Sequence, residues 1–207
     1  MNLDTITLWE TIERAAEYEQ ACFERFNKNP KLGGYQTVNQ LDLGKHDWLK
    51  MIDKTLSLAR TKGTADHKNA IALKYQNVGY NDENSSMACI SDASFPNMFK
   101  DIAENAGLSH WWYRIQAQEV GKTFPAHVDS LRSWSLEFPD VAKTHTHLDV
   151  KRFQIFGSDQ EVGHFMSVGS AQLSWKAGDV VQFDHRVPHA TANSGFTPKV
   201  IVVIEGV

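Results

Sequence analysis

Hydrophobic residues recur at helical spacing near the start of the chain, and short runs of β-forming residues dominate after Gly107. Between residues 8 and 26 the apolar positions follow the 3.6-residue period of an amphipathic helix. Thr7 and Glu10 form the signature of a capping box at the start of this segment. Pro30 is expected to end it, because proline disfavours helix at the residue before it. The pattern predicts a helical first half and a β-rich second half.

Two further helices and one short strand are expected before Gly107. A second helix is predicted over about residues 47–61, where apolar side chains again return to one face. A third is expected to open near Pro96, since proline is favoured in the first helical turn, and to end at Gly107 in a left-handed conformation. The short strand is expected at residues 70–75.

After Gly107, six short segments are rich in β-branched and aromatic residues, and glycine-containing turns separate most of them. The expected strands are 111–120, 152–156, 164–168, 171–175, 180–183 and 200–205. Many short strands at close spacing are typical of a sandwich or barrel. We therefore expect an α+β fold with a double-stranded β-helix (jelly-roll, cupin-like) core and the N-terminal helices packed outside one sheet.

Length, composition and charge narrow the class of protein. A chain of 207 residues suffices for one well-packed domain, with residues 1–109 as a mostly helical support and residues 110–207 as the jelly-roll core that holds the site. A net charge of −4 without a long basic run argues against nucleic acid as a partner. No secretion signal, membrane span or metal-type cysteine spacing is evident, which predicts a cytoplasmic protein with no membrane partner.

Two histidines and one aspartate in the last third of the chain form a candidate metal site. His127 and Asp129 are two residues apart, so on an extended strand both side chains face the same way, and His189 adds a distant third ligand. Two imidazoles and one carboxylate can hold a divalent metal on one face and leave the opposite face open, as in non-haem Fe(II) oxygenases. Lys199 can supply a cation for an acidic cosubstrate.

The sequence also contains a rival pair, His147 and Asp149, and a rival third histidine, His185. A strand and a glycine turn precede His127, whereas the residues before His147 are polar and indicate a loop, so the context favours the first pair. His185 lies beside Asp184 and is interpreted as a residue at the rim of the site. The sequence alone leaves the roles of the rival residues open.

The linked spacing of these motifs resembles that of the 2-oxoglutarate- and Fe(II)-dependent dioxygenases over about residues 110–207. The segments that carry the resemblance are Ile115-Gln116-xxxx-Gly121-xxxxx-His127-x-Asp129 and Trp175-Lys176-Ala177-Gly178-Asp179-Val180-Val181-x-Phe183-Asp184-xxxx-His189-xxx-Asn193-xxxxx-Lys199. Residues 152–156 and the HxxxN tail are similar to the aspartyl/asparaginyl hydroxylase-like group, whereas Lys199 is similar to the prolyl 4-hydroxylases. Asp129, which the first group commonly lacks, and the incomplete glycine pattern around Gly163 leave the subfamily open.

The resemblance implies a role for each candidate residue. His127, Asp129 and His189 would bind Fe(II) and serve catalysis, and Lys199 would pair with the C5 carboxylate of 2-oxoglutarate. Arg152 would contact a carboxylate of the cosubstrate or substrate, with a structural ion pair as the alternative.

Four further residues are expected near the site. Tyr113 and Gln116 lie on the first strand and are candidates to line the cosubstrate pocket, although core packing is favoured for Tyr113. Arg132 and Trp134 follow the HxD motif and are expected either to touch the substrate or to belong to a plain surface loop.

The implied reaction is hydroxylation of an unactivated C–H bond, coupled to conversion of 2-oxoglutarate and O₂ into succinate and CO₂, with ascorbate as an expected stimulant. Halogenating relatives replace the carboxylate ligand, so Asp129 favours hydroxylation. The substrate would be a small molecule, a peptide or a protein, such as a free or peptidyl amino acid; no motif names it or the oligomeric state. Two alternatives remain: a cupin-like metalloenzyme that does not use 2-oxoglutarate, and a non-catalytic jelly-roll binding module.

Overall fold

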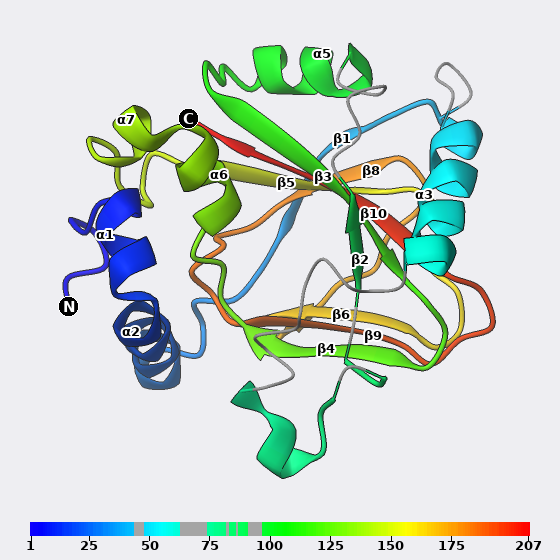
Figure 1. Cartoon of the computed structure of the whole chain (residues 1–207), viewed down its shortest axis with the longest axis horizontal. Helices are drawn as coiled ribbons and strands as arrows, with labels where there is room; N and C mark the ends of the chain where they lie inside the picture. Colours follow the sequence, from blue (N-terminus) through cyan, green and yellow to red (C-terminus); the bar gives the residue numbers. More distant parts are fainter. Residues whose placement is uncertain (44–47, 63–73, 82, 86, 91–96) are drawn as a thin grey trace.

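Two antiparallel sheets form the centre of the computed structural model, which describes all residues except 44–47, 63–73, 82, 86 and 91–96 (Figure 1). The strand order is β1-β8-β5-β10-β3-β2 in the larger sheet and β4-β9-β6-β7 in the smaller. The strands are β1 (Gln36–Gln40), β2 (Ala88–Ile90), β3 (Trp111–Gln118), β4 (Lys122–His127), β5 (Lys151–Phe156), β6 (His164–Val168), β7 (Ala171–Gln172), β8 (Asp179–Gln182), β9 (His189–Asn193) and β10 (Lys199–Gly206).

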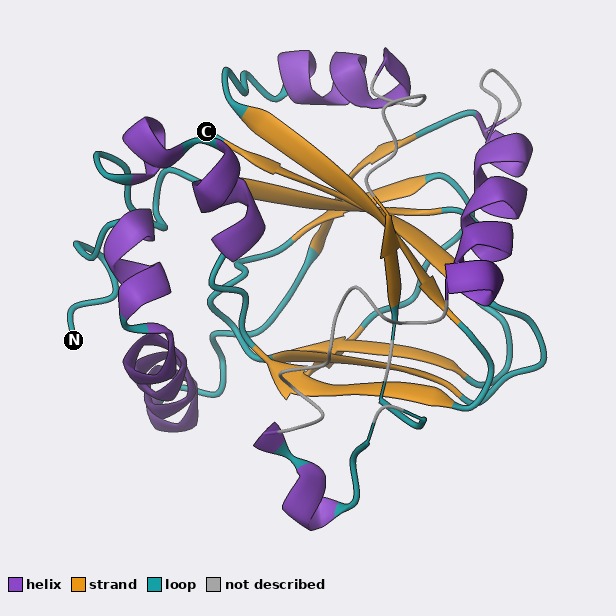
Figure 2. Ribbon diagram, viewed as in Figure 1, coloured by secondary structure: helices purple, strands orange, loops and turns teal. Residues whose placement is uncertain are grey.

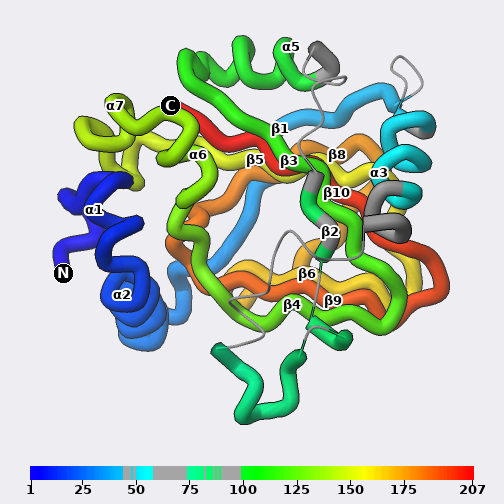
Figure 3. Tube along the Cα trace, in the orientation of Figure 1, coloured from blue at the N-terminus to red at the C-terminus, as the bar shows by residue number. Residues whose placement is uncertain are grey.

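From β3 to β10 the chain crosses repeatedly between the two sheets, as the tube in Figure 3 shows. β3, β5, β8 and β10 lie in the larger sheet, and β4, β6, β7 and β9 lie in the smaller. Antiparallel strands wound alternately into two packed sheets form a jelly roll, or double-stranded β-helix. The strand order therefore confirms the expected α+β fold with this core.

Helices cover one face of the larger sheet and one end of the two sheets (Figure 2). On the outer face of the larger sheet, Trp48 of α3 and Phe99 of α5 pack edge to face, 5.7 Å between ring centroids, in one cluster with Ile115. α1, α2, α6 and α7 lie together at the end of the sheets. The helices are α1 (Leu8–Glu13), α2 (Ala15–Lys28), α3 (Trp48–Lys62), the 3-10 helix η2 (Gln76–Val78), α5 (Asn97–Asn105), α6 (Arg132–Glu137) and α7 (Pro139–Ala142).

The first predicted helix is two helices in the structure. The capping box is present: the Thr7 side chain accepts a hydrogen bond from the Glu10 backbone at 3.1 Å, and Glu10 accepts one from the Thr7 backbone at 2.9 Å. The helix breaks at Arg14, whose φ of −121° and ψ of 36° are not helical. The break lets α1 bury Leu8 against α6 while α2 buries Tyr18 in a different apolar cluster. α1 and α2 lie at the end of the two sheets. The expectation that helices pack outside one sheet therefore holds for α3 and α5 and not for α1 and α2.

Four strands were not expected from the sequence, and two of these carry candidate ligands. β4 contains Pro125 at a register shift, and β9 is built of His, Ala, Thr and Asn rather than large β-forming residues. Of the expected strand at 171–175, only residues 171–172 pair. Residues 70–73 of the expected strand at 70–75 lie outside the described residues. Every helix in the described ranges is too short or too polar to span a bilayer.

Candidate metal centre

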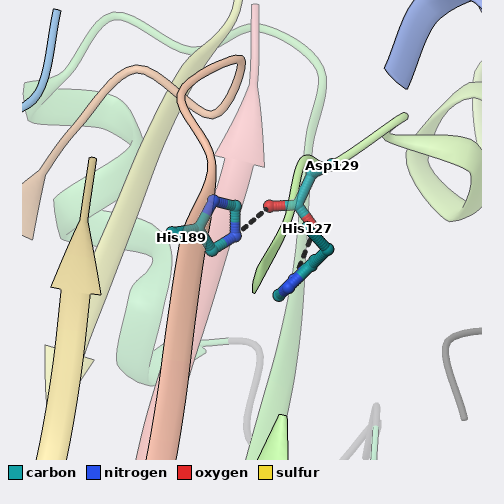
Figure 4. A group of neighbouring side chains, drawn as sticks. All are labelled: His127, Asp129 and His189. Atoms are coloured by element: carbon teal, nitrogen blue, oxygen red, sulfur yellow. Dashed lines mark ion pairs between the residues drawn. The ribbon is translucent and has the colours of Figure 1, made fainter. Parts of the chain in front are cut away.

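The three predicted ligands converge on one point between the sheets (Figure 4). His127 ends β4, Asp129 lies in the loop that follows, and His189 opens β9. His127 stands opposite His189 in the antiparallel pairing of β4 with β9, which brings their ring centroids to 4.3 Å. Asp129 Oδ2 lies 2.9 Å from His189 Nε2, and Asp129 Oδ1 lies 3.9 Å from His127 Nε2. Strand register therefore brings His189 to His127, and Asp129 follows His127 two residues later in the chain.

Backbone carbonyls fix the orientation of both imidazoles. His127 Nδ1 lies 2.9 Å from the Pro125 carbonyl oxygen, and His189 Nδ1 lies 2.9 Å from that of Val187. A carbonyl oxygen only accepts, so each Nδ1 carries the proton and each Nε2 keeps a lone pair. Burial lowers the pKa of His127 well below its usual value and that of His189 to about 3. Both rings are thus neutral, as metal ligation requires.

The donor atoms fit a divalent metal ion. Among the described residues, His189 Nε2 is buried without a hydrogen-bond partner, whereas the buried Asp129 Oδ2 has an ion pair with the Arg152 guanidinium. A buried polar atom without a partner loses the free energy of hydration and gains nothing in return, so such atoms call for a ligand. Two imidazole nitrogens and one carboxylate oxygen are the set that holds non-haem Fe(II) and leaves further coordination positions open.

A cavity of about 380 Å³ opens beside the three ligands. Its volume is within the range of small-molecule binding sites. Besides the ligands, it is lined by side chains of both sheets and of the loop after Asp129, among them Cys89, Arg114, Gln116, Arg132, Arg152, Gln154, Met166, Thr191 and Ile201. The structure therefore brings Gln116 and Arg152, two of the predicted cosubstrate-binding residues, to the same cavity as the metal ligands.

Lys199, at the start of β10, is not among the residues that line this cavity, and only 2% of it is exposed. Its ammonium group donates to the carbonyl oxygens of Phe165 at 2.9 Å and Ala192 at 3.2 Å, and it contacts the Thr191 hydroxyl. Among the described residues it has no carboxylate partner, and burial lowers its pKa to about 7. Thr191 lines the cavity, so its hydroxyl connects the lysine to that space.

The expectation that Tyr113 lines the cosubstrate pocket is wrong. Tyr113 packs on Phe99 of α5, with ring centroids 4.8 Å apart, in the cluster on the outer face of the larger sheet. Side chains alternate along a strand, so Tyr113 and Gln116, three residues apart, face opposite ways. The alternative of core packing holds for this tyrosine.

Replacing Tyr113 with alanine is therefore expected to lower the free energy of unfolding by about 3 kcal/mol, because it removes a buried aromatic ring. The affinity for 2-oxoglutarate should not change, because the ring lies on the other face of the sheet. Urea denaturation measures the first quantity and calorimetric titration of the folded variant the second. If the variant binds 2-oxoglutarate more weakly at unchanged stability, Tyr113 contributes to the cosubstrate pocket after all.

Two arginines neighbour Asp129. Arg152 contacts its carboxylate directly, and Arg114 Nη2 lies 3.7 Å from Asp129 Oδ1. Burial and the nearby Arg114 lower the pKa of Arg152 to about 9, so it stays charged at neutral pH. Arg114 was missed in the sequence analysis, although it lies two residues from Gln116 and strand alternation places the two on one face.

The rival residues do not form a comparable site. His147 Nε2 lies 2.8 Å from the Thr11 hydroxyl, and His147 Nδ1 lies 2.8 Å from His185 Nε2. Asp149 is exposed and accepts a hydrogen bond from the Thr146 backbone at 2.8 Å. His147 and Asp149 thus serve separate local contacts. His185, interpreted as a rim residue, is buried beside His147.

Of the two residues after the HxD motif that were expected near the substrate, Arg132 lies at the cavity and Trp134 lies in the core. Arg132 is exposed and lines the cavity. Trp134 is fully buried and donates to the His110 carbonyl oxygen at 3.0 Å, so it serves the core.

No family model matches the chain, and no curated protein matches it. Among solved structures it is similar to a non-heme monooxygenase, ThoJ, in a nickel complex (16% identity, 89% of this chain and 76% of that one, TM-score 0.48). It is also similar to a viral collagen prolyl hydroxylase from Paramecium Bursaria Chlorella virus-1 in a 2-oxoglutarate complex (11%, 84% and 96%, 0.47). A third is a putative sugar phosphate isomerase from Acidithiobacillus ferrooxidans (18%, 59% and 60%, 0.35), so the chain spans less than two thirds of that protein. The fold assignment rests on the strand order described above.

Proposed function

We propose that this protein is an oxygenase that uses Fe(II), 2-oxoglutarate and O₂ to hydroxylate an unactivated C–H bond. One observation carries the proposal. His127, Asp129 and His189 bring their free ligand atoms within 4.8 Å of one another at the wall of a cavity large enough for small molecules. A buried lysine that contacts the cavity-lining Thr191 and has no carboxylate partner among the described residues adds support. A jelly-roll binding module would not need this arrangement.

In the proposed reaction the residues of the chain bind and orient the reactants. His127 Nε2, His189 Nε2 and an Asp129 oxygen would hold Fe(II), which supplies the redox chemistry with O₂. Lys199 and the Thr191 hydroxyl would bind the C5 carboxylate of 2-oxoglutarate, since a partly dry site strengthens a charge-assisted hydrogen bond. Met166 and Ile201 give the cavity apolar walls that exclude water. The balance is R–H, 2-oxoglutarate and O₂ in, and R–OH, succinate and CO₂ out.

Succinate formation tests the proposal most directly. The purified protein is incubated with Fe(II), ascorbate and 2-oxoglutarate, and succinate is measured with and without candidate substrates. Slow succinate formation without substrate, or stoichiometric binding of 2-oxoglutarate to the Mn(II)-loaded protein, is expected. If the protein takes up metal but neither binds nor consumes 2-oxoglutarate, the proposal fails.

The binding of 2-oxoglutarate is expected to depend on pH through Lys199. Burial holds the pKa of this lysine at about 7 in the free protein, and a bound carboxylate would raise it. Between about pH 7 and pH 10 the complex would therefore hold a proton that the free protein lacks. Affinity should fall as pH rises through this window, with proton uptake on binding. Calorimetry in buffers of different ionisation enthalpy measures that uptake, and its absence at pH 8 would contradict the assignment.

One observation favours a second candidate, a cupin-like metalloenzyme that does not use 2-oxoglutarate. A lysine ammonium has three donors, and Lys199 already has three acceptors in the carbonyls of Phe165 and Ala192 and the hydroxyl of Thr191. In that case Lys199 would only join the two sheets. Metal uptake without any 2-oxoglutarate binding would select this candidate.

A further inference from the structure

Two arginines at the metal centre, the buried Arg152 and the half-buried Arg114, have fewer hydrogen-bond acceptors than their guanidinium groups can use. Arg152 is only 3% exposed; its Nη1 contacts Asp129 Oδ2, and its Nε has no hydrogen-bond partner among the described residues. Arg114 Nε also has no hydrogen-bond partner among the described residues. The carboxylates nearby are Asp129, which both arginines approach, and Glu205, whose Oε1 lies 3.7 Å from Arg114 Nη1.

The two arginines lie on the same face of the larger sheet. Arg114 stands opposite Val203 of β10, and Arg152 stands opposite Glu205 of the same strand from the other side. Val203 and Glu205 are two residues apart, so the side chains around them share one face, which lines the cavity. The two guanidinium groups thus flank the position of the metal from the larger sheet, while both histidines come from the smaller sheet.

The charges at this level of the cavity leave one positive charge to be neutralised. The next step rests on the proposed function. Arg114 and Arg152 are balanced by Asp129 and Glu205. Both ligand histidines donate through Nδ1 to backbone carbonyls, so each binds the metal through an unprotonated Nε2 and adds no charge. Fe(II) would add two positive charges, and the 2-oxoglutarate carboxylate that accompanies it would remove one. A buried net charge without a partner is unfavourable, so a further anion is needed here.

We propose that the substrate is a small carboxylic acid, such as a free amino acid, and that Arg152 and Arg114 bind its carboxylate beside the metal. Guanidinium forks match carboxylates in two parallel hydrogen bonds, which explains two arginines rather than two lysines. Because Arg152 contacts Asp129, a metal ligand, the bound carboxylate lies close to the reacting centre. The hydroxylated carbon is then only a few bonds from the acid group.

The test compares acids with their amides on the unaltered protein. The full chain is loaded with Mn(II) and 2-oxoglutarate, which do not turn over, and titrated calorimetrically with the twenty free L-amino acids and their primary amides. At least one acid should bind, and its amide should bind at least about ten-fold more weakly, since the charged hydrogen bonds are lost. Equal binding of acid and amide, tighter binding of peptides with amidated ends, or no binding by any acid would overturn the proposal.

Variants assign the effect to the two arginines. Arg152→Gln and Arg114→Gln should each weaken the bound acid at least about ten-fold. Arg14→Gln, which alters an exposed arginine outside the cavity lining, should not. Arg152→Lys keeps the charge without the fork and provides a folded comparison if Arg152→Gln is unstable; it should still weaken the acid. An equal loss in Arg14→Gln would contradict the assignment.

The same titrations separate this inference from the proposed function. The affinity for 2-oxoglutarate should be unchanged in Arg152→Gln. If that variant weakens 2-oxoglutarate as much as the acid, Arg152 binds the cosubstrate and the inference is wrong. If the unaltered protein fails to bind Mn(II) or 2-oxoglutarate, the proposed function itself is wrong.

Discussion

Asp129→Ala is expected to abolish hydroxylation and to lower the affinity for Mn(II) at least about 100-fold. Loss of a residue that merely supports a ligand costs about 10- to 100-fold in metal affinity, so loss of one of three ligands should cost more. The substitution also leaves Arg152 and Arg114 without the carboxylate that they approach, which is unfavourable in a buried site. Asp129→Asn keeps the shape and is the better-folded partner for the measurement.

Asp149→Ala is the matched control, because Asp149 occupies the same position in the rival HxD pair. Its carboxylate only accepts hydrogen bonds from Thr146, so metal affinity and turnover should stay unchanged. Isothermal titration with Mn(II) and succinate formation report on both variants. If Asp149→Ala loses the metal and Asp129→Ala keeps it, the site lies at His147 instead.

Lys199→Met is expected to weaken 2-oxoglutarate binding at least about 30-fold and to leave metal affinity unchanged. Removing one partner of a buried charge pair costs about 2 kcal/mol or more, which corresponds to that factor. Methionine fills the space of the lysine stem, so the loss is chiefly that of the ammonium group. Titration of the Mn(II)-loaded variant with 2-oxoglutarate measures the effect.

Lys151→Met controls for the loss of a positive charge on the larger sheet. Lys151 is exposed, does not line the cavity and donates to the Ala106 carbonyl oxygen at 2.6 Å. It should bind 2-oxoglutarate as the unaltered protein does. Equal weakening of metal and cosubstrate in Lys199→Met would instead indicate that Lys199 only stabilises the contact between the sheets.

The strands that were predicted correctly are those that fill the interior of the protein. β5 and β10 are buried along nearly their whole length, so their sequences are rich in large apolar and β-branched residues. β4 and β9 were missed because their positions are occupied by ligand residues, a proline and small side chains. Function there overrides the composition from which strands are recognised.

The ligands could be found from sequence spacing, but their surroundings could not. Spacing selects His127, Asp129 and His189 because each comes with a characteristic flanking segment. The arginine pair depends on which strands are neighbours in the larger sheet, and β5 and β10 pair across an interval that spacing does not reveal. Because side chains alternate along β3, Gln116 in the cavity already implies that Arg114, and not Tyr113, faces the same cavity.

β9 combines several requirements in five residues. Burial alternates along it, so His189, Thr191 and Asn193 all point inward. They supply a metal ligand, the contact with Lys199 and, through Asn193, hydrogen bonds to the carbonyl oxygens of Gln118 and Thr197 at 2.9 Å. A slip of one residue in its pairing would turn all three outward at once. The metal site and the stability of the fold therefore constrain the same short strand. An insertion in it would disrupt both the metal ligand and the hydrogen bonds that Thr191 and Asn193 make.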